Sequence, residues 1–332
     1  MSQSSSTRRQ ILAGAAIGLA ASILPARGQQ KLSLKLGHQY PLDHPVTIGA
    51  AKAAELVKEK SGGRVEIVIF PAGQLGTGKE LDQQVSDGGL DFSIDGPGII
   101  GNWHRPVSIF EAPFLCDGFA TLVKMMDSPW SLAQFKMLAE KQNMQRVGKP
   151  WYYGARHFTT RDRALKTVAD ARGLKLRVPE VPLYLDMIRA IAAVPTPMAL
   201  AEVYLSLQTG VVDGQENPLP TINSQKFFEV QKFVNLTAHI VTPQIIIAGA
   251  KRWNAIPEAD RVLIVDALNA GGEVNDKILI DLETSLVGEF RSKGVTIVEP
   301  DRASFQNAMK PVYEKNETIW GKGAFAELQK LG

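Results

Sequence analysis

Apolar and polar positions alternate from Leu32 to Leu36, a spacing typical of a half-buried β-strand. Residues 45–60 then place apolar side chains at helical intervals and end at a Ser-Gly-Gly sequence, and residues 65–70 form a second strand-like run. A helix between two strands with short connections predicts a right-handed crossover in a parallel sheet. A helix at 79–87 and a strand at 90–94 extend the pattern, so the first part of the chain predicts an α/β lobe.

The pattern restarts after Gly154 and predicts a second α/β lobe. Helices and extended segments alternate again, and the last segment runs into a loop at residues 215–218. In chain order we expect a short helix at 168–172, a strand at 174–178, a helix at 182–191, an extended segment at 193–198, a helix at 199–208 and a strand at 211–213.

The chain then returns to the first lobe, because strand-like runs at 233–237 and 241–250 precede a helix at 259–291 that is long enough to brace both lobes. More than one crossing between lobes predicts hinge strands and a ligand cleft between the lobes. We expect lobe I to comprise residues 29–153 plus about 242–282, and lobe II residues 154–241 plus about 283–332 with the C-terminal helices.

The N-terminus predicts export from the cytoplasm. Arg8 and Arg9 precede an apolar run that ends at Leu24, and Ala26 and Gly28 supply the small residues of a cleavage site, so residues 1–28 form a candidate signal peptide of the twin-arginine type. The alternative, a membrane anchor, is disfavoured because the run is short and glycine-rich for a bilayer core of about 30 Å. The mature protein is expected in the periplasm.

Charge excludes several partners. The signal carries three of the 37 basic residues and no acidic one, which leaves 37 − 3 = 34 basic against 34 acidic residues in the mature chain. A neutral chain gives no reason to expect nucleic acid or an acidic membrane surface as a partner. The single cysteine, Cys116, excludes an intramolecular disulfide.

No motif in the sequence predicts a cofactor site, a metal site or a catalytic site. The glycines at 73–78 resemble a phosphate loop, but Glu80 stands where the magnesium-binding hydroxyl belongs, and the glycines at 96–101 precede no evident helix. The five histidines lack metal-ligand spacing, and no nucleophile with a base and an acid is evident. We expect no enzyme, although an exported hydrolase or lyase of a carboxylated substrate remains the competing class.

Arg177 is the residue that most needs explanation. It lies near the end of an alternating segment, Gly-Leu-Lys-Leu-Arg-Val-Pro at 173–179. A buried guanidinium keeps its charge and therefore requires an anionic partner. That partner is either a ligand or, in the alternative, an interlobe ion pair with Glu180, Glu202 or Glu216.

Other polar and aromatic residues accompany Arg177. Arg156 begins the second lobe, and Asn217 lies before a proline that holds it extended. Asn217 can both donate and accept hydrogen bonds, and Trp151 can pack on a ligand.

These residues occur in a series of short motifs. The motifs are Gly37-His-Gln-Tyr40, Phe70-Pro-Ala-Gly-Gln-Leu75, Gly89-Leu-Asp-Phe92, Glu111-Ala-Pro-Phe114, the segment 173–179, Pro195-Thr-Pro-Met198, Glu202-Val-Tyr204 and the segment 208–218. With these motifs in this order, the chain resembles the extracytoplasmic solute-binding proteins of tripartite ATP-independent periplasmic (TRAP) transporters, the DctP family.

The resemblance implies a two-lobed α/β periplasmic binding protein fold of type II-like architecture and a small carboxylate ligand. It places a bidentate contact to that carboxylate on Arg177, a second contact on Asn217 and an assisting one on Arg156. It also implies an integral-membrane TRAP permease as partner, no cofactor and a monomeric protein. A sensor that serves a membrane kinase is a further alternative with the same fold.

The first-lobe contacts decide which carboxylate binds. Candidates near the ends of the early strands are Gln39, Tyr40, His44, Gln74 and Asp95. Polar groups such as Asp95 and His44 suit a hydroxylated ligand, which favours a sugar acid such as a uronate over a C4-dicarboxylate or a 2-oxo acid.

Overall fold

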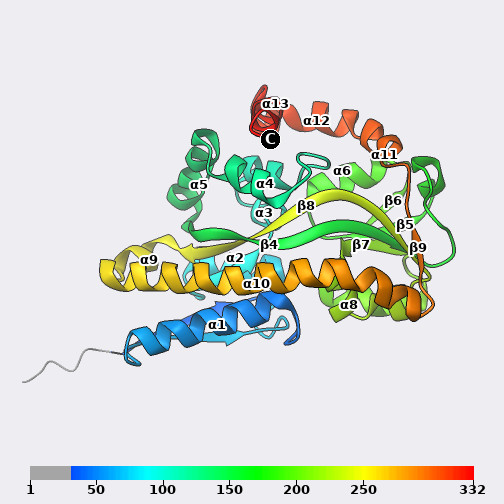
Figure 1. Cartoon of the computed structure of the whole chain (residues 1–332). Helices are drawn as coiled ribbons and strands as arrows, with labels where there is room; N and C mark the ends of the chain where they lie inside the picture. Colours follow the sequence, from blue (N-terminus) through cyan, green and yellow to red (C-terminus); the bar gives the residue numbers. More distant parts are fainter. Residues whose placement is uncertain (1–30) are drawn as a thin grey trace, which may run out of the picture. The chain divides into compact units, whose positions relative to one another are not determined.

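The computed structural model describes residues 31–332 (Figure 1). The predicted signal peptide lies outside the described residues. Residues 31–332 form a nine-stranded mixed sheet in the order β2-β1-β3-β8-β4-β7-β5-β6, with β9 paired to β8. The strands are β1 Leu32–Gly37, β2 Val65–Phe70, β3 Phe92–Asp95, β4 Met144–Thr160, β5 Lys175–Val178, β6 Val194–Pro197, β7 Gly214–Pro218, β8 Phe233–Gly249 and β9 Thr296–Val298.

Helices cover both faces of this sheet (Figure 1). The α-helices are α1 Pro45–Lys60, α2 Gly78–Asp87, α3 Pro97–Ile100, α4 Phe119–Met126, α5 Pro129–Gln142, α6 Pro182–Ala190, α7 Val203–Thr209, α8 Leu219–Ser224, α9 Ala250–Ala255, α10 Glu258–Ser292, α11 Arg302–Ala308, α12 Lys310–Trp320 and α13 Ala324–Gln329. Short 3₁₀ helices are η1 Arg105–Glu111, η2 Val168–Ala171, η3 Leu200–Glu202 and η4 Phe227–Glu229. Among residues 31–332, no helix is both long and apolar enough to span a membrane.

The long antiparallel strands β4 and β8 join the two α/β parts of the sheet. The end of β3 pairs with β8, with Asp95 opposite Ile245, and the end of β7 pairs with β4, with Pro218 opposite Arg156. The carboxyl ends of the strands on the two sides therefore converge on the middle of β4 and β8. Ligands bind outside such strand ends in open α/β sheets.

Two apolar cores run along the sheet, one on each face, because successive side chains of a strand point to opposite faces. Ile245 and Ile247 of β8 join the core beneath α4, α5, α6 and α12, while Ile246 and Ala248 join the core beneath α1 and α10. The long helix α10 contacts α1, β4 and α8, as expected for a bracing helix.

The periodic elements are confirmed with little change. Helix α1, strand β2 and the parallel pairing of β1 with β2 agree with prediction, and α10 differs from its predicted range by one residue at each end. The lobe boundaries stay a prediction. One of the shifts in the β4–β8 register, between Tyr152 and Gly154, lies at the lobe boundary predicted after residue 153.

Several local predictions are wrong. Residues 215–218 form β7 between β4 and β5 rather than a loop, because tertiary pairing overrides their polar character, and residues 211–213 are not a strand. The two runs at 233–250 are one strand, β8. Helices α4 and α5 were not predicted, and a one-turn helix, α3, lies within the glycine motif at 96–101.

Close packing of α1 against α10 depends on glycine. A methyl group added to Gly49 would lie 2.6 Å from the carbonyl oxygen of Gly271, and one added to Gly271 would meet the carbonyl oxygen of Gly49. Because these neighbours are backbone atoms of two helices, neither methyl group can be accommodated without moving a helix.

We therefore expect Gly271→Ala to lower the free energy of unfolding by about 1–3 kcal/mol through overpacking. The control is Gly288→Ala in the same helix, where an added methyl group meets nothing within 4 Å. Helix propensity predicts that this control gains up to about 1 kcal/mol. Urea denaturation of both variants checks the prediction, and equal stability changes would contradict it.

Candidate ligand-binding site

A pocket lies over the middle of β4 and β8, where the strand ends converge. It brings together the predicted contacts Gln39, Tyr40, Asp95, Arg156, Arg177 and Asn217. Side chains that were not predicted as contacts also line it, namely Glu111, Tyr153, Tyr184 and Gln244. The pocket therefore draws on β1, β3, β4, β5, β7 and β8 or on the residues that directly follow them.

Arg177 is buried at the wall of this pocket, with 2% of its surface exposed. Its Nε and Nη2 donate to the carbonyl oxygen of Met198 at 3.1 and 2.7 Å. Within residues 31–332 it has no ion pair, and its Nη1 donates to no protein acceptor. Burial lowers the pKa of Arg177 to about 10, which leaves the guanidinium charged at neutral pH.

Glu216 pairs with Arg156 rather than with Arg177. Nε of Arg156 donates to one carboxylate oxygen of Glu216 at 2.5 Å, and Nη2 donates to the other at 2.8 Å. Although burial opposes it, the guanidinium of Arg156 holds the pKa of Glu216 below its ordinary value. Among residues 31–332, the alternative ion pairs of Arg177 with Glu180, Glu202 or Glu216 are therefore not formed.

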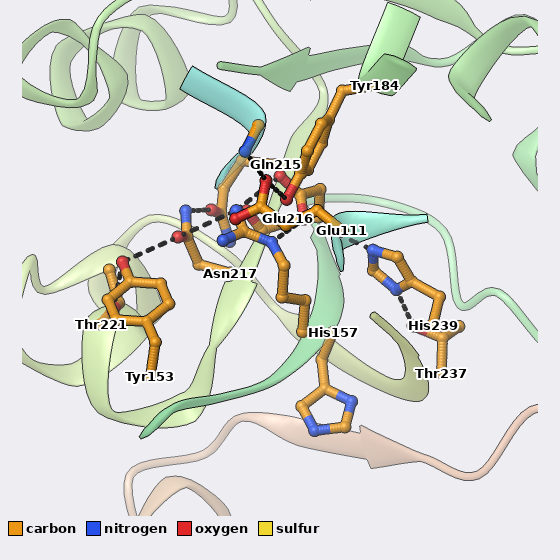
Figure 2. Close-up of polar contacts among 12 residues, drawn as sticks. Glu111, Tyr153, His157, Tyr184, Gln215, Glu216, Asn217, Thr221, Thr237 and His239 are labelled. Carbon is orange, nitrogen blue, oxygen red and sulfur yellow. Dashed lines mark hydrogen bonds and ion pairs between the residues drawn. The ribbon is translucent and has the colours of Figure 1, made fainter. Parts of the chain in front are cut away.

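A hydrogen-bond network fixes the orientation of Asn217 (Figure 2). Its Oδ1 accepts from Arg156 Nη2 at 3.2 Å and from the hydroxyl of Tyr153 at 3.4 Å, while its Nδ2 donates to Gln215 at 2.7 Å. An amide nitrogen carries two hydrogens, so one N–H of Asn217 remains. The network thus presents Asn217 as a donor, which suits an anionic ligand.

Three predicted contacts lie outside the pocket lining. His44 is fully buried, caps α1 by accepting from Val46 N at 3.1 Å, and contacts Thr221 Oγ1 at 3.1 Å. Trp151 packs in the core against Gly272, and Gln74 is exposed in the loop before α2. Any binding role for these residues stays a prediction.

Two buried carboxyl groups, Asp95 and Glu111, also line the pocket. Asp95 was expected there; Glu111 was not predicted as a contact, although its motif was recognised. Burial raises the pKa of Glu111 to about 7 and the pKa of Asp95 well above its ordinary value, the latter aided by the neighbouring Asp82. No sequence pattern indicated that Glu111 faces a pocket, since its position depends on the packing of η1 against α3 and β8.

The two glycine motifs have structural roles beside this pocket. Thr77 and Glu80 form a capping box that begins α2, which explains the glutamate that was incompatible with a phosphate loop. The carboxylate of Glu111 occupies the space where side chains of Gly96 and Gly98 would lie and accepts from Gly98 N at 3.1 Å. Glycine is thus required at 96 and 98 for close approach.

A comparison with known families gives the pocket its context. The family described as bacterial extracellular solute-binding protein, family 7, matches residues 36–318. The chain belongs to this family, DctP. The resemblance predicted from the motifs is confirmed, and so is the expected class of extracytoplasmic solute-binding protein.

Relatives and solved structures resemble the chain over most of its length. The chain is 34% identical to the sialic acid-binding periplasmic protein SiaP of Vibrio cholerae over 299 residues, which cover 90% of this chain and 92% of SiaP. A TRAP periplasmic solute-binding protein from Polaromonas sp. JS666 bound to D-erythronate has a TM-score of 0.85 and 30% identity, covering 90% of this chain and 98% of that one. One from Sulfitobacter sp. NAS-14.1 with β-D-galacturonate has a TM-score of 0.84 and 30% identity at the same coverage.

These comparisons confirm the predicted two-lobed α/β fold, and they agree with the predicted periplasmic location, since SiaP is a periplasmic protein by name.

The raised pKa of Glu111 also predicts that the free energy of unfolding depends on pH. An unfolded glutamate titrates near about 4.3, so between that pH and about 7 the folded protein binds more protons and loses stability as pH rises. Relative to Glu111→Gln, which lacks this proton, wild type should lose up to about 4 kcal/mol across the interval. Urea denaturation at several pH values checks this, and parallel stability curves would contradict it.

Proposed function

We propose that this DctP-family protein captures a small hydroxylated carboxylate, a sugar acid such as a uronate, and delivers it unchanged to a TRAP membrane permease. An exported enzyme that acts on a carboxylated substrate in the same pocket is the less favoured function. The observation that carries the proposal is Arg177, a buried guanidinium that lines the pocket and has no ion pair within residues 31–332. A C4-dicarboxylate or a 2-oxo acid is the less favoured ligand.

Arg177 and Asn217 hold the carboxylate in this proposal. Nη1 and Nη2 of Arg177 supply N–H groups beyond those bound to Met198, and Asn217 adds the amide N–H that its network leaves over. Arg156 has an assisting role, because its charge is balanced by Glu216 and only its Nη1 lacks a protein acceptor within residues 31–332. Water exclusion around such contacts strengthens them.

Neutral polar groups favour a hydroxylated ligand over a plain fatty acid. Gln39 and Gln244 line the pocket on the side away from Arg177's strand, β5, and Tyr153 lies beside Asn217. The proteins from Polaromonas and Sulfitobacter, bound to erythronate and galacturonate, carry ligands of this kind. The shared fold and the polar lining together support a sugar acid.

A thermal-shift screen of the mature protein identifies the class of ligand. A ligand at about 100 times its dissociation constant stabilises the folded state by roughly 2.7 kcal/mol. We expect D-galacturonate or related acids to raise the melting temperature, and the matching neutral sugars, such as D-galactose, to leave it unchanged. Equal shifts from the neutral sugars would refute the carboxylate assignment.

Arg177→Ala should weaken binding of the best acid at least about tenfold, since a hydrogen bond to a charged group contributes about 1.5–3 kcal/mol. The matched control is Arg189→Ala, which removes a guanidinium that is 59% exposed. Isothermal titration calorimetry of both variants measures the loss. Unchanged affinity in folded Arg177→Ala would return Arg177 to a purely structural role.

A further inference from the structure

Asp95 and Glu111 are buried carboxyl groups in the pocket that have no cationic partner. They are 3% and 4% exposed, and within residues 31–332 neither forms an ion pair. Arg156 is bound to Glu216, and Arg177 is assigned to the ligand carboxylate. The remaining cation of the lining, Lys79, lies exposed at the rim.

Asp95 enters the pocket from the side opposite the arginines, whereas Glu111 is bonded to Tyr184 and faces the Arg156 guanidinium. Asp95 pairs with position 245 of β8 and Arg156 with position 240, a separation of about 17 Å along an extended strand. Across the sheet, β8, β4 and β7 lie between β3 and β5, the strand of Arg177. A ligand whose carboxylate lies at Arg177 therefore directs its other end towards Asp95.

Both acids have acceptor capacity that the protein leaves unused. Glu111 Oε2 accepts from Tyr184 at 3.0 Å and from Gly98 N at 3.1 Å, and Asp95 Oδ1 accepts from Gly96 N at 2.8 Å. Among residues 31–332, Oε1 of Glu111 and Oδ2 of Asp95 receive no hydrogen bond. Carboxyl oxygens in this state suit ligand hydroxyl groups, which can donate to them.

We propose that Asp95, with Glu111, is the specificity element of this pocket: the two carboxyl groups bind the hydroxyl groups of a sugar acid beyond its carboxylate and reject a second carboxylate there. The inference rests on the proposed function and narrows it to hydroxylated monocarboxylates. Glu111 acts by contact with the ligand, and Tyr184 holds it in place.

A second carboxylate would add a like charge to an already acidic end. Asp82 is a further acidic group next to Asp95, and burial raises the pKa of Asp82 to about 7. The negative charge of Glu216 also raises the pKa of Glu111. Two groups that face Glu111 favour its charged form. They are the Arg156 guanidinium, whose charge is already balanced by Glu216, and the hydroxyl of Tyr184. A dianionic ligand would thus leave negative charge buried without a counterion, which is strongly unfavourable.

Matched pairs of acids test the proposal, because each pair differs only in a terminal CH₂OH or carboxylate. The pairs are D-erythronate with meso-tartrate, D-gluconate with D-glucarate, and D-galactonate with galactarate. Titration calorimetry at about pH 8, above the pKa of Glu111, should show at least about tenfold preference for the monocarboxylate in any pair that binds wild type.

Glu111→Gln keeps the size of the side chain but removes its charge, so we expect this preference to fall by about tenfold. Asp95→Asn should act in the same direction. Glu314→Gln, on the exposed face of α12, removes one negative charge far from the pocket and should leave the preference intact.

An unchanged preference in folded Glu111→Gln would overturn the proposal, as would wild type that binds a dicarboxylate as tightly as its matched monocarboxylate. The second result, with binding still lost in Arg177→Ala, would contradict only the specificity assignment and leave the carboxylate-binding function standing. Wild type that binds none of the six acids would contradict both.

Discussion

The buried ion pair between Arg156 and Glu216 determines which arginine of the pocket keeps an unbalanced positive charge. It joins adjacent strands, β4 and β7, and satisfies Glu216 with two hydrogen bonds from one guanidinium. Since a buried carboxylate requires such a partner, Glu216 is no longer available to Arg177. One arginine is thus neutralised by the protein itself, and the other keeps an unbalanced positive charge at the pocket wall.

The long strands β4 and β8 place that charge where a ligand can reach it. Because β3 and β7 approach these strands from opposite directions, their carboxyl ends meet over the centre of the sheet. The side chains that follow each strand then face a common space, although they come from distant parts of the sequence. Regular strands hold these side chains more rigidly than loops would, which suits a site that must recognise one geometry.

Periodic elements could be predicted from the sequence, and non-local pairings could not. Helix α1 and strand β2 have clear spacing of apolar residues, whereas β7 consists of Gly-Gln-Glu-Asn-Pro and is a strand only because β4 and β5 flank it. Likewise, the sequence identified Arg177 and Asn217 but did not indicate that Arg156 pairs with Glu216. His44 and Trp151 have chemistry suited to binding, yet helix capping and core packing explain their positions.

In the proposed function, the charge of Arg177 makes the anion part of the stable structure. Burial lowers its pKa only to about 10, so the guanidinium keeps its charge at neutral pH, and it forms no ion pair within residues 31–332. A buried cation without a counterion is strongly unfavourable. A carboxylate bound to both Arg177 and Asn217, as proposed, would remove this penalty and make its hydrogen bonds in the same step. Neutral sugars can fill the space but cannot supply the charge, so recognition of the acid follows from electrostatics before any hydroxyl group is compared.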